Sequence, residues 1–283
     1  MKLPYFLARR FVAGEHFEQA LPRVRQINEM GILTSLVLLG EEVKERSVAE
    51  ETVENYKELL KEMDAHSLRG SISIKLTMTG LSIDEELCRK HLHSILDTAS
   101  KLGRFVRIDM ESSRYTEATL RLFREAHDTW NGHVGIVIQA ALHRTERDII
   151  ELADMGADVR LCKGAYKEPA DIALRKMPEI REAFKRYGKI LLERTPLTRF
   201  ATHDDELVTW LRDYASESDI PKDRFEFQML YGLREETMVQ LAADGYRARI
   251  YVPYGTMWFP YFRRRLLERK ENVFFLLANL FKK

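Results

Sequence analysis

The 283-residue chain contains only two cysteines, Cys88 and Cys162, which lie far apart and form no CxxC pair. Neither a disulfide framework nor a structural zinc site is expected, and a reducing compartment fits this usage. An excess of charge of one sign is also missing, since 45 Lys and Arg face 44 Asp and Glu and give a formal net charge of +1. This balance lacks the basic excess of a nucleic-acid-binding protein.

Long apolar runs are absent as well. No segment reaches the roughly 18 apolar residues that a membrane-spanning helix needs. The N-terminus MKLPYFLARRFVAGEHF carries Arg9 and Arg10 where a secretory signal would continue its apolar region. The most apolar stretch, residues 272–283, has the length of a packed helix. We therefore expect a cytoplasmic protein without a transmembrane segment, and a peripheral position at the inner face of the membrane stays open.

Several common catalytic and binding motifs are missing too. The sequence contains no GxGxxG dinucleotide fingerprint, no GxxxxGK[ST] phosphate loop, no HExxH pair and no GxSxG elbow. The eight histidines form no cluster, and His91 and His93 are spaced i, i+2, which directs their side chains apart on a helix. We therefore predict no metal site.

Short β-type runs alternate with helical patterns along the whole chain, and 45% of the residues are hydrophobic, which is ample for a core. The predicted strands are 32–39, 71–77, 105–111, 134–140, 158–164, 199–203, 224–230 and 247–254. Ser82 or Asp84, and Thr116, are expected to begin helices. The glycines expected to end helices are Gly31, Gly70, Gly103, Gly156 and Gly245.

Eight strand–helix units in one chain predict parallel strands joined by right-handed crossovers. We therefore expect residues 1–283 to form a single (βα)8 TIM-type barrel, with a short helix over 15–30 before the first strand. A C-terminal helix is expected to contribute to the active site. A doubly wound open sheet is the weaker alternative.

The polar phase of each predicted strand indicates which side chains point into this barrel. Ile72 and Ile74 form an apolar outer phase in the second strand, so its polar residues point inward. The same parity directs Arg107, Glu226, Gln228 and Arg249 inward. Six inward residues fall at or near carboxyl ends of different strands, where active sites of this fold lie: Lys75, Asp109, Gln139, Arg160, Thr202 and Tyr251. Any one of them could be a structural ion-pair partner, but together they favour a polar, anion-binding site.

The segment 251–270, YVPYGTMWFPYFRRRLLERK, is the second dense motif. Tyr261 precedes Arg264 and Arg265 by three and four residues, and Glu268 follows by one turn, so all four share a helix face. A solvated charged face is the simpler interpretation of this run. Against it, two guanidiniums beside aromatic residues suit a small carboxylated substrate, because arginine binds carboxylate in a bidentate manner.

Seven strings in order along the chain resemble the bacterial monofunctional proline dehydrogenases. They are IKLTMTG, RIDME, GIVIQAAL, VRLCKGAY, FATHD, FEFQMLYG and YVPYG…Y..RRLLE. The resemblance implies a (βα)8 flavoenzyme that uses FAD to oxidise L-proline to Δ1-pyrroline-5-carboxylate, the first step of proline catabolism to glutamate. It also implies hydride transfer to flavin N(5) and a quinone as electron acceptor.

The resemblance also implies roles for individual residues. The expected catalytic residues are Asp109, which organises the site, and Arg160, which contacts flavin N(5). The residues expected to bind proline are Lys75, Tyr166, Leu230, Tyr251, Tyr261, Arg264 and Arg265. The residues expected to bind FAD, besides Arg160, are Met110, Gln139, Lys163, Gly164, Ala165, Thr202, His203 and Glu268. A structural role explains His203 equally well, either as a helix cap or as a histidine whose hydrogen bonds are satisfied within the protein.

The chain departs from longer relatives in its short N-terminal region, and Arg263 lies outside the matched pair and is expected in solvent. Relatives that prefer hydroxyproline carry a smaller residue at the position of Tyr251, so tyrosine implies proline as substrate. Two other functions stay open. One is a Schiff-base lyase or aldolase with Lys75 or Lys163 as nucleophile, and the other is a non-catalytic barrel that binds small carboxylates.

Overall fold

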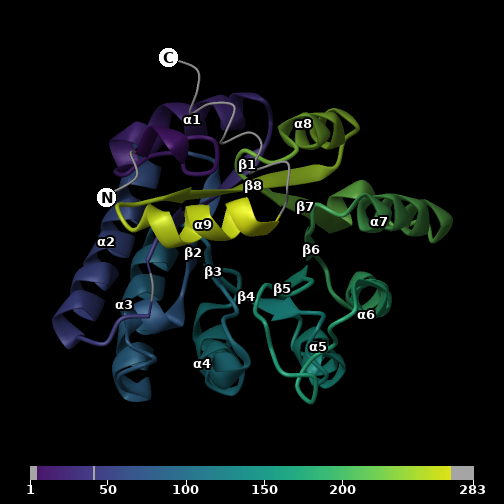
Figure 1. Cartoon of the computed structure of the whole chain (residues 1–283), viewed down its shortest axis with the longest axis horizontal. Coiled ribbons are helices and arrows are strands. Elements are labelled where there is room, and N and C mark those ends of the chain that lie inside the picture. The colour runs from purple at the N-terminus through teal and green to yellow at the C-terminus, as the bar shows by residue number, and fades with distance from the viewer. Residues whose placement is uncertain (1–4, 41, 269–283) are drawn as a thin grey trace.

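The computed structural model describes residues 5–40 and 42–268. Its strands close into a barrel in chain order, each parallel to the next, with β8 paired to β1 (Figure 1). This confirms the predicted (βα)8 barrel. The strands are β1 (Leu33–Leu38), β2 (Gly70–Ile74), β3 (Val106–Ile108), β4 (Val134–Gln139), β5 (Asp158–Cys162), β6 (Thr198–Ala201), β7 (Phe225–Leu230) and β8 (Arg247–Tyr254).

Helices follow every strand, and α1 (Phe17–Glu29) precedes β1, as expected. The others are α2 (Arg46–Ala65), α3 (Glu85–Lys101), α4 (Ser113–Trp130), α5 (Thr145–Asp154), α6 (Met177–Arg194), α7 (Asp205–Glu217), α8 (Glu235–Ala243) and α9 (Trp258–Glu268). Short 3-10 turns are η1 (Tyr5–Leu7), η2 (Leu76–Thr79) and η3 (Lys222–Arg224). Within the described ranges, no helix is long and apolar enough to cross a membrane.

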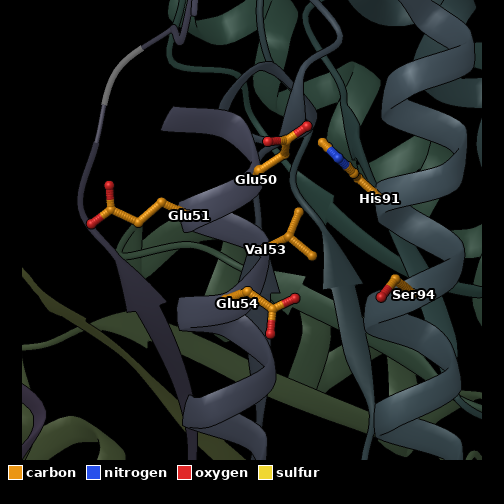
Figure 2. A pocket seen from close by; sticks show the side chains of 6 residues that line it. All are labelled: Glu50, Glu51, Val53, Glu54, His91 and Ser94. Carbon is orange, nitrogen blue, oxygen red and sulfur yellow. The ribbon is translucent and has the colours of Figure 1, made fainter. Parts of the chain in front are cut away.

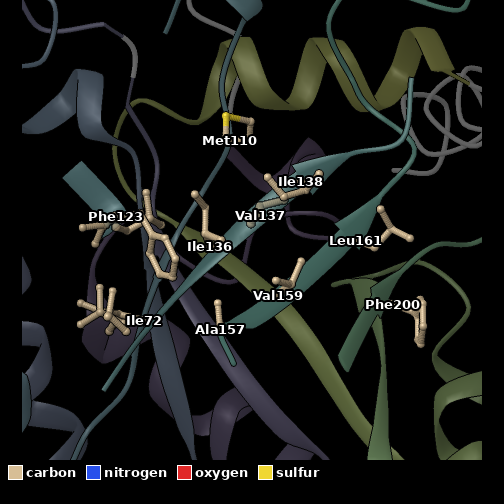
Figure 3. Close-up of a cluster of buried hydrophobic side chains, with 14 of the residues drawn as sticks. Ile72, Met110, Phe123, Ile136, Val137, Ile138, Ala157, Val159, Leu161 and Phe200 are labelled. Carbon is tan, nitrogen blue, oxygen red and sulfur yellow. The ribbon is translucent and has the colours of Figure 1, made fainter. Parts of the chain in front are cut away.

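The main core lies between the outer face of the barrel and the surrounding helices. Ile72, Ile136, Val159 and Phe200 are fully buried on the outward phase of their strands (Figure 3). Phe123 from α4 packs into the same cluster. Parallel strands that are covered in this way carry apolar residues on the helix side, which is why the polar residues of each strand are left for the barrel interior.

Three details of the sequence prediction are wrong. Gly70 does not end a helix but lies in β2 beside Thr34, where a Cβ would stand 2.3 Å from the Thr34 carbonyl oxygen. Thr116 does not begin a helix, because α4 already starts at Ser113 and Thr116 is buried inside it. Several strands also end earlier than predicted, since the chain turns away from the ladder at the barrel mouth. The other four glycines have positive φ, as predicted for helix ends.

A second apolar cluster joins the N-terminal segment to α9. Phe11 and Val12 pack against Trp258, Tyr261 and Phe262, apart from the main core. In Figure 1, α9 runs across the strands instead of standing in the outer ring beside α2 to α7. The turn before α9 contains Gly255 at φ +131°, where a Cβ would lie 3.1 Å from the Leu39 nitrogen. Glycine therefore allows the sharp turn that leads into α9.

The interior of the barrel holds a buried chain of ion pairs. Asp158 binds Arg107 and Arg199, and Glu226 binds Arg199 and Arg249. These contacts confirm the inward direction predicted for Arg107, Glu226 and Arg249. Each carboxylate is shared by two guanidiniums, so the charges satisfy one another despite their burial.

The N-cap of α3 provides a test of local stability. The Asp84 carboxylate accepts a hydrogen bond of 2.8 Å from the Leu87 N–H. Asp84→Ala is expected to lower the free energy of unfolding by about 1 kcal/mol, because one N–H at the helix start loses its partner. Asp84→Asn keeps an acceptor and should stay within a few tenths of the wild-type value. Urea unfolding of the three proteins would contradict this cap if both variants had equal stability.

Candidate active site

The centre of the site is a cluster of the buried Asp109 and Arg160 and the half-buried Tyr251, from three sides of the barrel. One carboxylate oxygen of Asp109 accepts from the Arg160 guanidinium, and the other accepts from the Tyr251 hydroxyl at 2.7 Å. The Arg160 guanidinium also lies 5.4 Å from the centre of the Tyr251 ring. Burial, followed by the Asp109 charge, raises the pKa of Tyr251 well above its usual value, although Arg160 opposes this. Tyr251 therefore stays a hydrogen-bond donor at neutral pH.

Two further polar groups orient Arg160 from the barrel interior. Its Nη1 lies 3.4 Å from Ser73 Oγ and 3.4 Å from Gln228 Oε1. Gln228 in turn donates to Glu226 at 2.6 Å. The guanidinium is thus held by partners on β2, β7 and the end of β3. Such fixed positioning is what a group near a reaction centre requires.

Lys75 follows Ser73, a partner of Arg160, by two residues, but it does not lie in a strand. β2 ends at Ile74, and Lys75 occupies the N-cap position of η2, so the predicted strand over 71–77 is too long. Its side chain is half-buried and makes no hydrogen bond or ion pair with any residue that the structure describes. An ammonium at this position is available to an anionic ligand.

The helix α9 contributes aromatic and cationic groups. Tyr261 is buried, and the Arg265 guanidinium lies 5.2 Å from the centre of its ring, so these two share a face as predicted. Arg264 is exposed and acts electrostatically on Tyr166, an exposed residue of the β5–α6 connection. Arg263 is exposed, which confirms its predicted place in solvent. Glu268 is the last residue of α9, but its side chain lies outside the described ones.

The connection after β5 passes close to Gln139. Gly164 adopts φ +115°, and a Cβ on it would lie 3.1 Å from Gln139 Oε1, so glycine permits the close approach. Ala165 and Tyr166 are exposed residues whose N–H groups have no hydrogen-bond partner in the described part of the chain. Lys163 binds Asp204 at 2.7 Å. This edge of the mouth therefore offers backbone donors and a lysine.

The end of β6 differs from the prediction. Thr202 was expected to point inward, but the inward residue of this strand is Arg199, which binds Glu226, while Phe200 packs outward. The parity assignment fails because it took the wrong phase: Thr202 has the parity of the outward Phe200, and β6 already ends at Ala201. The Thr202 hydroxyl accepts from the Asp204 N–H at 3.1 Å.

The remaining predicted residues surround the same end of the barrel. His203 Nε2 accepts from the Leu230 N–H at 2.9 Å, which joins the loop after β6 to the last residue of β7. Met110, just beyond β3, is buried in the main core (Figure 3). The barrel thus brings all the predicted residues whose side chains are described to its carboxyl-end mouth or to α9.

Sequence reasoning missed one residue of the mouth, Glu111. Its carboxylate accepts from the Thr77 N–H at 3.0 Å and from the Thr77 hydroxyl at 2.6 Å. It follows Asp109 by two residues, so strand parity places it on the same side. That parity was the signal that could have identified it.

A groove elsewhere on the surface lies between α2 and α3. It has a volume of about 300 Å³ and is lined by Glu50, Glu51, Val53, Glu54, His91 and Ser94 (Figure 2). None of the predicted site residues is among them. Over residues 5–40 and 42–268, no group of three His, Cys, Asp or Glu side chains is arranged to hold a metal ion.

Comparisons with known proteins agree with this barrel. The family model for proline dehydrogenase matches residues 20–277. The chain is 40% identical over 276 residues to proline dehydrogenase 1 of Bacillus subtilis, covering 98% of this chain and 91% of that protein. It is 35% identical over 280 residues to the proline dehydrogenase of Deinococcus radiodurans, covering 98% and 90%.

A solved structure gives the same result. Proline utilization A from Bdellovibrio bacteriovorus, inactivated by N-propargylglycine, superposes with a TM-score of 0.85 at 26% identity. The match covers 93% of this chain and 32% of that longer one. The fold, the matched length and the identity to both bacterial enzymes lead to one assignment: the chain belongs to the proline dehydrogenase family.

Proposed function

We propose that this proline dehydrogenase uses FAD to oxidise L-proline to Δ1-pyrroline-5-carboxylate at the mouth formed by Asp109, Arg160 and Tyr251. The observation that carries the proposal is an Arg160 fixed by Asp109 and by Ser73, together with Lys75, which follows Ser73 by two residues and has no side-chain partner among the described residues. An unpaired ammonium and an oriented guanidinium at the same end of the barrel suit an anionic substrate. We place the enzyme in the cytoplasm, at the periphery of the membrane. Its electrons would pass to a quinone.

The donor set around the mouth fits FAD. The unpartnered N–H groups of Ala165 and Tyr166 suit a diphosphate, because backbone donors can bind phosphate oxygens directly. Lys163 adds a cation beside them, held by Asp204. Gln139, Met110, Thr202, His203 and Glu268 complete the set of residues that we assign to the cofactor.

The chemistry divides between the cofactor and the chain. When bound, FAD supplies the acceptor for the hydride that leaves the ring carbon beside nitrogen. Oxidation of this C–N single bond to C=N also releases the proton of the nitrogen, so two electrons and two protons leave proline. Arg160 would supply a positive charge to stabilise the hydride acceptor. Its hydrogen bonds to Asp109, Ser73 and Gln228 fix that charge before substrate binds.

The substrate is held at its carboxylate and along its ring. We assign the carboxylate to Arg264, Arg265 and Lys75, because charge-assisted hydrogen bonds both bind and orient it. The ring is assigned to the apolar and aromatic walls formed by Tyr166, Leu230, Tyr251 and Tyr261. Holding the charge at one end and the ring at the other leaves only one face of the substrate for reaction.

Anaerobic titration with L-proline tests the proposal. The purified protein is expected to be yellow and to lose its visible flavin absorption when L-proline is added, with one Δ1-pyrroline-5-carboxylate formed per flavin reduced. Colourless protein that forms a borohydride-stable adduct on Lys75 would instead support a Schiff-base enzyme. Colourless protein that binds proline without converting it would support a carboxylate-binding barrel.

The two arginines of α9 can be tested separately from the cofactor. Arg264→Met or Arg265→Met is expected to weaken proline binding about 10- to 100-fold and to leave flavin bound, because each loses one charge-assisted carboxylate contact worth roughly 1.5–3 kcal/mol. The matched control is Arg263→Met, which removes an exposed arginine of the same helix. The readouts are KM for proline and flavin content. Loss of flavin, or the same KM in all three variants, would contradict the assignment.

Tyr251 is expected to select proline over trans-4-hydroxyproline by about a hundredfold, as an apolar wall does against an added hydroxyl. Tyr251→Ser should lower the efficiency with proline and narrow this ratio, measured as kcat/KM for both substrates. Tyr251→Phe is the matched control, because it removes the hydrogen bond to Asp109 but keeps the ring. Equal oxidation of both substrates by the wild type, or an unchanged ratio in the Ser variant, would show that Tyr251 is not the selector.

A further inference from the structure

We propose that Glu111 is a positioning residue for the substrate carboxylate, which acts by fixing the turn that presents Lys75. This inference rests on the proposed role of Lys75 in binding proline. Glu111 is only 7% exposed, yet its side chain meets no lysine or arginine within ion-pair distance in the described chain. A buried carboxylate without such a partner is costly, so its hydrogen bonds carry the explanation.

Both carboxyl oxygens of Glu111 accept hydrogen bonds from a single residue, Thr77. Oε2 accepts from the Thr77 N–H at 3.0 Å, and Oε1 accepts from the Thr77 hydroxyl at 2.6 Å. Thr77 lies in η2, two residues after Lys75. Two hydrogen bonds to one carboxyl group fix both the position and the rotation of this turn.

The direction of Lys75 depends on that turn. Lys75 is its N-cap residue, and its carbonyl oxygen accepts from the Met78 N–H at 3.0 Å. No side-chain hydrogen bond or ion pair from the described residues holds its ammonium. The Thr77 carbonyl further accepts from the Val43 N–H at 3.1 Å, which ties the turn to the connection after β1. The backbone of η2 is therefore the element that aims Lys75.

Glu111, which follows β3, also connects this turn after β2 to the end of the next strand, β4. Its backbone oxygen accepts from Gln139 Nε2 at 2.7 Å, and Gln139 lies against Gly164. Burial raises the pKa of Glu111, whereas the Thr77 hydrogen bonds and the charge of Lys75 oppose that rise. One residue thus sets the distance between the lysine assigned to the substrate and the amide assigned to the cofactor.

A conservative substitution tests the role. Glu111→Gln keeps the volume, but an amide has only one acceptor oxygen for the two Thr77 donors. KM for L-proline is expected to rise about tenfold, with flavin content and melting temperature unchanged and kcat within about threefold. Thr77→Val, which removes only the hydroxyl, should raise KM about threefold. Tetrahydrofuran-2-carboxylate, a ring acid with no oxidisable amine, should bind about tenfold more weakly to the Glu111→Gln variant by flavin absorbance titration.

Two comparisons distinguish positioning from a general structural effect. In a Lys75→Met background, Glu111→Gln should have no further effect on KM, because the group that it positions is gone. Glu42→Gln is the matched control at the same rim. Glu42 accepts from the Tyr115 hydroxyl and makes no hydrogen bond or ion pair with η2 within the described residues, so KM should not change.

The result that would overturn this inference is an unchanged KM in Glu111→Gln, or an equal rise of KM with and without Lys75. A rise in KM accompanied by a lower flavin content or a lower melting temperature would also overturn it, since that pattern indicates a structural role. Failure of the proposed function would give a different result: L-proline would not bleach the flavin absorption of the wild-type protein.

Discussion

Arg160→Met is expected to lower kcat/KM for L-proline by two to three orders of magnitude. The substitution removes the positive charge assigned to the hydride acceptor, and loss of one oriented electrostatic group of this kind costs about 10²- to 10³-fold. It also leaves Asp109 with the Tyr251 hydroxyl alone, since Arg160 is its ion-pair partner. The effect should fall mainly on kcat, because the proposed carboxylate ligands stay in place.

Two controls accompany this measurement. Arg160→Lys keeps a charge but loses the planar fork that reaches Asp109, Ser73 and Gln228 together, so its activity should be intermediate. Asp109→Asn keeps the shape and tests whether Arg160 needs its carboxylate partner. Stopped-flow bleaching of the flavin by L-proline gives the rate of the chemical step. A decrease of less than tenfold in Arg160→Met would contradict the role assigned to this residue.

Glu226→Gln is expected to lower the free energy of unfolding by about 3–5 kcal/mol. Glu226 is fully buried and accepts from Arg199 at 3.0 Å and from Arg249 at 2.7 Å. Replacing its carboxylate by an amide leaves two buried guanidiniums without their shared counter-charge, which is the costly way to break a buried ion pair. Glu54→Gln, at an exposed pair with Lys57, should change stability by less than about 1 kcal/mol.

The same ion pairs predict how stability depends on pH. Burial tends to raise the pKa values of Glu226 and Asp158, but their arginine partners outweigh it, so both lie below their usual range, that of Asp158 at about 2. A carboxyl group with a lowered pKa in the folded state stabilises it above the unfolded pKa, near 4. This contribution is lost as pH falls from about 4 toward 2. In Glu226→Gln, urea unfolding should show a weaker acid dependence, and an unchanged one would contradict the account.

The barrel could be predicted from the sequence because its signals are local and repeated. Eight apolar runs separated by amphipathic helices specify a closed sheet, and strand parity located Asp109, Arg160 and Tyr251 correctly. These predictions succeed because every strand has one face toward the helices, so its polar residues have only the interior left.

Parity failed at the sixth strand. Thr202 lies beyond β6 and has the parity of Phe200, which packs outward, whereas Arg199 is the residue that points inward. The interior role of Arg199 depends on Asp158 and Glu226, which lie 41 and 27 residues away in sequence. Pairings of this kind follow from the closure of the barrel, and no local pattern reports them.

The most direct test of the central claim is a crystal structure of the flavin-loaded protein with tetrahydrofuran-2-carboxylate. We predict flavin at the carboxyl ends of the strands, with its ring against Arg160 and Gln139, and the acid bound by Lys75, Arg264 and Arg265. Flavin or acid bound elsewhere, such as in the groove between α2 and α3, would contradict the account.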